Sequence, residues 1–198
     1  SQIINNFYID IFKPTQKLLD YVNSIIIDKS NIIGIQVRFG DEFLNKNIDN
    51  TRTTERITDN LNQIQIQCSK LFNNNYNIFL TSDNSNIYSK CLEVFDNSKL
   101  IYNKTDVIHL DKDIYDHSDY SLLKLFSDHY ILSVHTDILF VTIRSNFGLY
   151  SALISKNNNF YSIINLNKYN NMSFLDSPKF FKHEFTSSSP SNFSIEID

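Results

Sequence analysis

Hydrophobic and polar positions follow two patterns along the chain, one with the period of a helix and one typical of buried strands. Apolar residues spaced three and four apart predict helices over residues 13–27, 53–72, 85–95, 120–134 and 147–154. Short apolar runs closed by polar turn residues predict strands over residues 32–39, 77–81, 99–102, 137–143 and 160–165. Strands that alternate with helices indicate a parallel sheet covered on both faces, so the expected fold is a Rossmann-like, doubly wound α/β domain.

The apolar stripes also predict which residues face the core. Leu71, Leu92 and Phe126 fall on the stripes of three expected helices, and we expect them to pack on the sheet. The two cysteines, Cys68 and Cys91, fall in expected helices as well. We interpret them as buried or half-buried thiols that form no disulfide framework.

Length and pattern together predict the domain organisation. A chain of 198 residues can bury a full core without disulfides or metal. After about residue 175 the sequence becomes Ser-rich and loses its periodicity. We therefore expect one domain over residues 1–175 and a C-terminal tail over residues 176–198 that packs on the surface or frays.

Composition excludes several classes of function. The chain has only 3 glycines, spaced too widely for a Walker loop or a G-x-G-x-x-G turn. A net charge of -4 with dispersed basic residues argues against a nucleic-acid partner. The longest apolar stretch, residues 131–143, is interrupted and too short to span a bilayer, so we expect no transmembrane segment. No signal peptide is recognisable, which slightly favours the cytoplasm and leaves the secretory-pathway lumen as the alternative.

Polar residues follow directly after three of the expected strands, at residues 38–41, 81–84 and 144–148. The carboxyl ends of parallel strands share one edge of a sheet, which is where such folds bind ligands. Arg38 offers a planar guanidinium group suited to phosphate. Ser145 and Asn146 open an expected helix, whose free N–H groups also favour an anion. These residues indicate a diphosphate clamp, with a surface salt bridge for Arg38 and ordinary capping by Ser145 as the alternatives.

The residues at these strand ends resemble motifs of a known family. Residues 34–41, GIQVRFGD, resemble the H/Q-x-R-x-G-D motif of the GDP-fucose-dependent fucosyltransferases with the GT-B fold, a grouping of α1,2-, α1,6- and protein O-fucosyltransferases. Residues 81–83 resemble the second motif of the family, and residues 127–148 resemble the third. Phe12-Lys13-Pro14 is similar to the F-x-P segment that opens this half of the enzymes. Gln36 and the Phe147-Gly148 pair favour the xyloglucan-type members.

The resemblance implies that the chain is the donor-binding domain of a GT-B glycosyltransferase. Such a domain would bind GDP-fucose and transfer fucose, with inversion, to a hydroxyl of a glycan or glycoprotein acceptor, without a metal or other cofactor. Arg38 would be the catalytic residue, because it would bind the β-phosphate and stabilise GDP as it leaves. The donor-binding residues that the motifs imply are Gln36, Arg38, Gly40, Asp41, Ser82, Asp83, Ser145, Asn146, Phe147 and Gly148.

The sequence departs from the family pattern in two respects. Phe39 stands where many members have a second arginine, and Arg144 is the substitute we consider. The family's N-terminal lobe, which helps to hold the acceptor, has no counterpart in this sequence, so we expect an additional acceptor-binding domain or a partner chain. Glu42 is a candidate base by its position, although it also fits a solvated turn carboxylate.

Two other functions stay open at this point. Asp111 and Asp113 form a D-x-D triplet, which in metal-dependent GT-A glycosyltransferases holds Mn²⁺ and a nucleotide diphosphate. Their neighbours would also allow a His/Asp zinc site, or simply a solvated acidic loop; these neighbours are His109, Asp116, His117 and Asp119. A module that binds a nucleotide sugar without turning it over is the second alternative.

Overall fold

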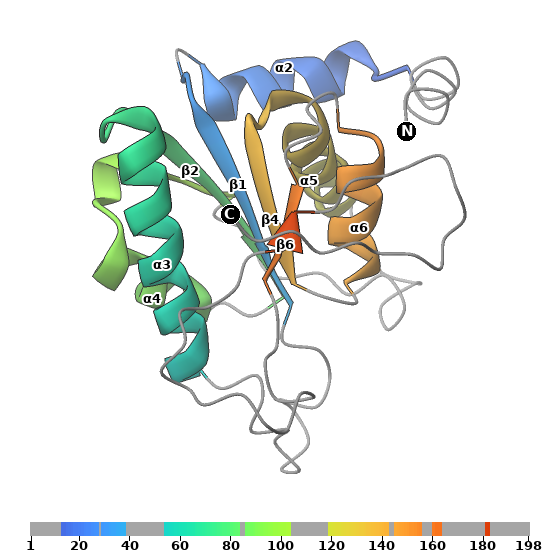
Figure 1. Ribbon diagram of the computed structural model, residues 1–198. Helices are drawn as coiled ribbons and strands as arrows, with labels where there is room; N and C mark the ends of the chain where they lie inside the picture. The colour runs from blue at the N-terminus through green and yellow to red at the C-terminus, as the bar shows by residue number, and fades with distance from the viewer. Residues whose placement is uncertain are drawn as a thin grey trace.

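The computed structural model of the protein describes eight segments of the chain: residues 13–27, 29–38, 54–83, 86–103, 119–142, 145–155, 160–163 and 181–182. Helices and strands alternate along these segments and form one sheet with helices on both faces (Figure 1). The predicted α/β class is therefore confirmed.

The sheet has six strands in the order β3-β2-β1-β4-β5-β6. They are β1 (Ile32–Val37), β2 (Asn77–Ser82), β3 (Leu100–Ile101), β4 (Ile138–Thr142), β5 (Phe160–Ile163) and β6 (Phe181–Lys182). The first five are parallel, whereas β6 runs antiparallel to β5. The order extends outward from β1 in both directions, as in a doubly wound Rossmann-like sheet. No strand is predicted at β6, which lies in the expected tail.

In the described segments five α-helices cover the sheet: α2 (Gln16–Ile26), α3 (Thr54–Phe72), α4 (Asn86–Val94), α5 (Asp119–Tyr130) and α6 (Asn146–Leu153). Helices α3 and α4 lie on one face, and α2, α5 and α6 lie on the other (Figure 1). The single helix predicted over residues 120–134 is in fact α5 followed by a π-helical segment, η4 (Ile131–His135). Within the described segments no helix is both long and apolar enough to cross a membrane.

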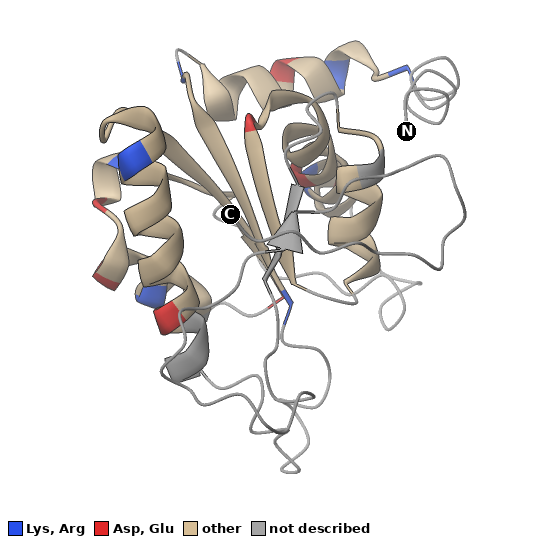
Figure 2. Cartoon of the chain, viewed as in Figure 1, with Lys and Arg blue, Asp and Glu red and all other residues tan. Residues whose placement is uncertain are grey.

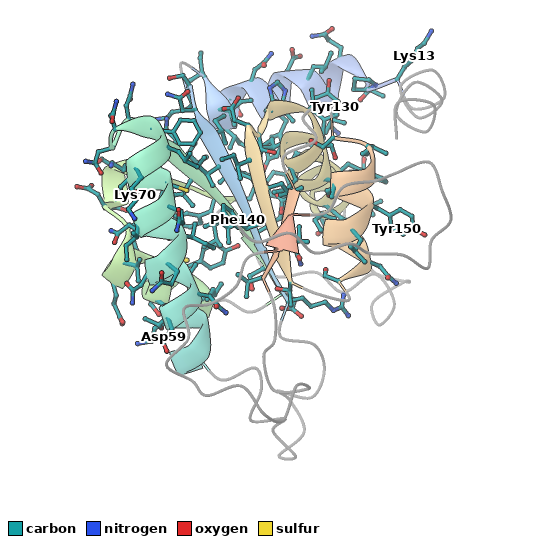
Figure 3. All side chains as sticks on the ribbon, viewed as in Figure 1. Lys13, Asp59, Lys70, Tyr130, Phe140 and Tyr150 are labelled. Carbon is teal, nitrogen blue, oxygen red and sulfur yellow. The ribbon has the colours of Figure 1, made fainter. Side chains whose placement is uncertain are left out.

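Because the strands are buried from both sides, their residues contribute to two hydrophobic clusters. Ile33, Ile35 and Phe140 join α3 and α4 in one cluster, while Phe79 and Leu139 join α2, η4 and α6 in the other. Figure 3 shows Phe140 among side chains between β4 and the α3 side. Strands β1 to β5 contain no charged residue, and most of the charged residues coloured in Figure 2 lie on helices or next to the ends of helices and strands.

The cysteine prediction is confirmed and one part of the core prediction is wrong. Cys68 and Cys91 are fully buried in the α3–α4 cluster, and burial raises the pKa of both thiols to about 12. Leu71, Leu92 and Phe126 are exposed instead of facing the core. They lie at the margins of their stripes, where the rotation of the helix, about 100° per residue, turns a side chain toward solvent.

Candidate functional site

The order of the strands reverses between β1 and β4, and this switch point is where doubly wound sheets bind ligands. Val37 at the end of β1 pairs in register with Ser82 of β2. On the other side of β1, Gln36 pairs with Val141 of β4. The carboxyl ends of β1, β2 and β4 therefore lie side by side, which confirms that the three predicted strand ends share one edge.

Eight of the ten predicted donor-binding residues belong to the described segments, because Gly40 and Asp41 lie outside them. Gln36, Ser145 and Gly148 are buried, whereas Arg38, Ser82, Asp83, Asn146 and Phe147 are partly or fully exposed. Gln36 lies in β1, whereas Ser145 and Gly148 lie at the start of α6, and the partly exposed Phe147 packs against the core cluster on that face. Phe39, Glu42, Arg144, Asp111 and Asp113 also lie outside the described residues.

Thr142, at the end of β4, connects the two elements that carry the predicted anion-binding groups. Its hydroxyl accepts a hydrogen bond from the backbone N–H of Arg38 at 3.0 Å and donates one to the carbonyl of Gln36 at 3.1 Å. Its own carbonyl accepts from the backbone N–H of Ser145 at 3.0 Å. Thr142 thus fixes the backbone of both Arg38 and Ser145, the residue that precedes α6. No pattern in the sequence indicated this role of Thr142.

Ser145 is the N-cap of α6. Its backbone is extended (φ -80°, ψ 107°), and its hydroxyl accepts a hydrogen bond from the N–H of Gly148 at 3.4 Å. This confirms the capping interpretation of Ser145. It also leaves the N-terminal turn of α6, with exposed Asn146, at the carboxyl end of β4. The free N–H groups and the positive end of the helix dipole in such a turn favour an anion.

Gln36 has an unusual environment inside this edge. The residue is 4% exposed, and its Oε1 is the only buried side-chain oxygen or nitrogen without a hydrogen-bond partner among the residues that the structure describes. A Cβ atom on Gly148 would lie 2.7 Å from this oxygen and 2.8 Å from Cβ of Val141. Glycine is needed at position 148 because α6 packs so closely on β1 and β4. The unpaired acceptor therefore lies against the first turn of α6.

The end of β2 is supported from the α4 side. The hydroxyl of Tyr88 is hydrogen-bonded to the backbone of Ser82, and its ring packs on Tyr102 with 4.7 Å between the centroids. Burial raises the pKa of Tyr88 above its usual value, so the phenol is neutral at physiological pH. This aromatic pair fixes the backbone that presents Ser82 and Asp83.

The metal-dependent alternative receives no support from the described segments. They contain no group of three or more His, Cys, Asp or Glu side chains that could hold a metal ion. Asp111 and Asp113, which carry that alternative, lie outside these segments together with His109, Asp116 and His117. The D-x-D site therefore stays a prediction.

Comparisons with known proteins show a similarity to solved structures. No protein-family model matches the chain, and no curated protein matches it. The fold is similar to the crystal structure of the fucosyltransferase NodZ from Bradyrhizobium, with a TM-score of 0.44 and 17% sequence identity. The match covers 73% of this chain and 42% of that chain, so the protein described here spans about two fifths of the length of NodZ.

Proposed function

We propose that this chain is the nucleotide-sugar-binding domain of a glycosyltransferase, and that the donor's diphosphate binds between Arg38 and the N-terminal turn of α6. The observation that carries this proposal is the double attachment of Thr142, which hydrogen-bonds the backbone of Arg38 and that of Ser145. It places a cation and a helix N-terminus at the β1–β4 switch point. Both groups favour phosphate oxygens, and together they neutralise a diphosphate without a metal.

The donor we propose is GDP-fucose, on the resemblance of the strand-end motifs. Ser82 and Asp83 at the end of β2 contact the guanosine, while Asn146 and Phe147 bind the diphosphate through the first turn of α6. Gln36, Ser145 and Gly148 are buried beside this site. In this proposal the unpaired oxygen of Gln36 accepts a hydrogen bond from the bound nucleotide sugar. Asp41, which lies outside the described segments together with Gly40, orients Arg38 in this proposal, as the resemblance implies.

The reaction we propose is a single displacement with inversion at C1 of fucose. A hydroxyl of the glycan acceptor forms the new bond to C1 while the bond from C1 to the β-phosphate oxygen breaks. The electron pair leaves with GDP, where Arg38 stabilises the developing charge, and a base takes the proton of the acceptor hydroxyl. Glu42 is the candidate base in this chain, with an additional acceptor-binding domain or partner chain as the other source.

Titration calorimetry with GDP, GDP-fucose, UDP and a UDP-sugar tests the donor. We expect binding of the two guanosine ligands only. Arg38→Ala removes charge-assisted hydrogen bonds worth about 1.5–3 kcal/mol, so the affinity for GDP falls roughly 10- to 150-fold. Lys29→Ala is the matched control, because it removes an exposed cation just before β1, at the opposite edge of the sheet.

Equal GDP affinity in Arg38→Ala and the parent protein would refute the clamp. A requirement for Mg²⁺ or Mn²⁺ in binding would favour the metal-dependent alternative. Release of fucose from GDP-fucose by this chain alone would separate the transferase from a module that only binds the donor.

A further inference from the structure

A chain of hydrogen bonds joins α5 to the first turn of α6. His129 Nδ1, on α5, lies 2.8 Å from the hydroxyl of Ser151 on α6. That hydroxyl donates its proton to the carbonyl of Phe147 at 3.0 Å. A hydroxyl has a single proton, so with this proton donated to Phe147 the bond from His129 requires the tautomer in which Nδ1 carries the hydrogen.

The acceptor at the end of this chain belongs to a peptide group of the proposed diphosphate site. The carbonyl of Phe147 and the N–H of Gly148 form one peptide group, so a hydrogen bond to the carbonyl polarises the N–H as a donor. The N–H of Gly148 is one of the groups at a helix N-terminus that have no intrahelical carbonyl partner. Its present acceptor, the hydroxyl of Ser145, is 3.4 Å away. The hydrogen bonds from His129 through Ser151 therefore affect the N–H of Gly148, which is a donor in the first turn of α6.

The position of His129 is fixed on several sides. Its ring lies 5.6 Å from the ring of Phe147, with 58° between the planes. Its backbone carbonyl accepts from the hydroxyl of Ser133 in η4 at 2.6 Å. Burial lowers the pKa of the imidazole to about 4, so the ring is neutral at physiological pH and acts through its hydrogen bond instead of a charge.

We propose that His129 is a positioning residue, which sets the Phe147–Gly148 peptide group of α6 through Ser151 and thereby prepares the first turn for a diphosphate. The geometric part of this inference stands on the hydrogen bonds alone. The effect on a diphosphate rests on the proposed function.

Two measurements on each variant test the inference: NMR amide exchange at Gly148 and GDP affinity by calorimetry. His129→Leu keeps an apolar side chain but removes the donor. We expect faster exchange at Gly148 and a GDP affinity reduced about 3- to 10-fold, the range of one ordinary hydrogen bond. His129→Asn restores an N–H close to the position of Nδ1, and we expect it to recover most of both losses. Ser151→Ala added to His129→Leu should produce little further change.

Ile64→Val is the control for a general loss of stability. Ile64 is buried on α3, in the cluster on the opposite face of the sheet, and the substitution costs about 0.5–1.5 kcal/mol in most cores. If His129→Leu exchanges at Gly148 no faster than Ile64→Val, or if His129→Asn exchanges as fast as His129→Leu, the positioning role is refuted. If exchange changes while GDP affinity does not, the link to the diphosphate is refuted. Absence of GDP binding by the parent protein refutes the proposed function alone, because the exchange measurement does not need a nucleotide.

Discussion

Two buried polar regions of this protein differ in how completely their atoms are paired. On the buried face of α5, Lys124 Nζ contacts Asp128 Oδ2 at 3.0 Å, and the amide of Asn103 donates to Ser127 at 3.2 Å and also to Asp128. The hydroxyl of Tyr21 donates to Asn103 Oδ1 at 3.1 Å. We call these five residues the Lys124 network. At the switch point, by contrast, the buried oxygen of Gln36 has no partner among the described residues.

On the proposed function, the difference separates a structural role from a binding role. A buried acceptor without a partner costs about 1–3 kcal/mol, and we propose that the bound nucleotide supplies the missing hydrogen-bond donor to Gln36. The Lys124 network satisfies its own members, so it needs no ligand. Burial raises the pKa of Asp128, and the charge and hydrogen bond of Lys124 act against that rise. The contrast predicts substitutions with opposite effects in the two regions.

The largest effect is expected from Lys124→Met. It leaves Asp128 buried and without its counter-ion, which in comparable cases costs about 3–5 kcal/mol of the free energy of unfolding. Urea denaturation measures this loss, and calorimetry on the folded protein should find an unchanged GDP affinity. Lys90→Met is the control, because Lys90 pairs with Glu93 on the surface and such pairs contribute little. A loss as small as that of the control would mean that the Lys124 network is not structural.

The next effect concerns pH and His129. Since the pKa of this histidine is about 4 in the folded protein and 6.5 in an unfolded chain, the unfolded state binds more protons between these values. Stability therefore falls as the pH is lowered from 6.5 to 4, by at most about 3 kcal/mol at 1.36 kcal/mol per pKa unit. The raised pKa of Asp128 contributes with the opposite sign.

His129→Asn separates the two contributions, because it removes the histidine and retains Asp128. Urea denaturation of the parent protein and the variant at pH 7, 6, 5 and 4 should show a steeper decline in the parent. Parallel pH profiles would contradict the assignment of a buried neutral imidazole.

Gly148→Ala should have an intermediate effect and should act on the site. The new Cβ would crowd both Gln36 and Val141, and overpacking of this kind costs about 1–3 kcal/mol. We expect reduced stability together with weaker GDP binding. Gly34→Ala provides the comparison, since its Cβ would lie 2.8 Å from Leu139 and Thr136, away from the proposed site. That variant should lose stability and keep its GDP affinity; equal losses of affinity in both variants would contradict the placement of the site.

The smallest effect, and the clearest contrast with Lys124→Met, is expected from Gln36→Met. Replacing the unpaired amide by an apolar side chain of similar length removes a buried orphan acceptor, so the free energy of unfolding should rise by about 1 kcal/mol. GDP affinity should fall at the same time. A loss of stability in urea would show that the oxygen of Gln36 has a partner in the unliganded protein, and the argument from its isolation would fail.

The helices and the parallel strands could be predicted because their signals are local. Apolar runs and helical stripes place the elements within a few residues of their observed bounds, and Arg38 and Ser145 stand out as polar residues at element ends. The strand order, the π-helical segment and β6 carry no such signal. Strand order depends on which edges pair, and β6 lies in the Ser-rich part of the sequence where the apolar pattern is lost.

The side-chain contacts at the candidate site could not be predicted from the pattern of apolar and polar residues. Thr142 is hydrogen-bonded to Arg38 and Gln36, which precede it by 104 and 106 positions in the sequence. His129 on α5 contacts Ser151 on α6. Nothing near Thr142 in the sequence distinguishes it from an ordinary strand residue. The roles of these side chains follow from the packing of elements that are distant in the chain.

The pairing of β1 with β4 also has a consequence for how the chain folds as it is synthesised. One edge of β1 pairs with β2. The other edge stays unpaired until β4 has been synthesised, because Ile33 pairs with Ile138, about a hundred residues later. Until then the nascent chain exposes an apolar strand with unpaired backbone groups in the middle of its future sheet. Non-local pairing of this kind slows folding and favours aggregation. A fragment that ends before β4 would therefore lack half of the proposed site and would also be difficult to keep in solution.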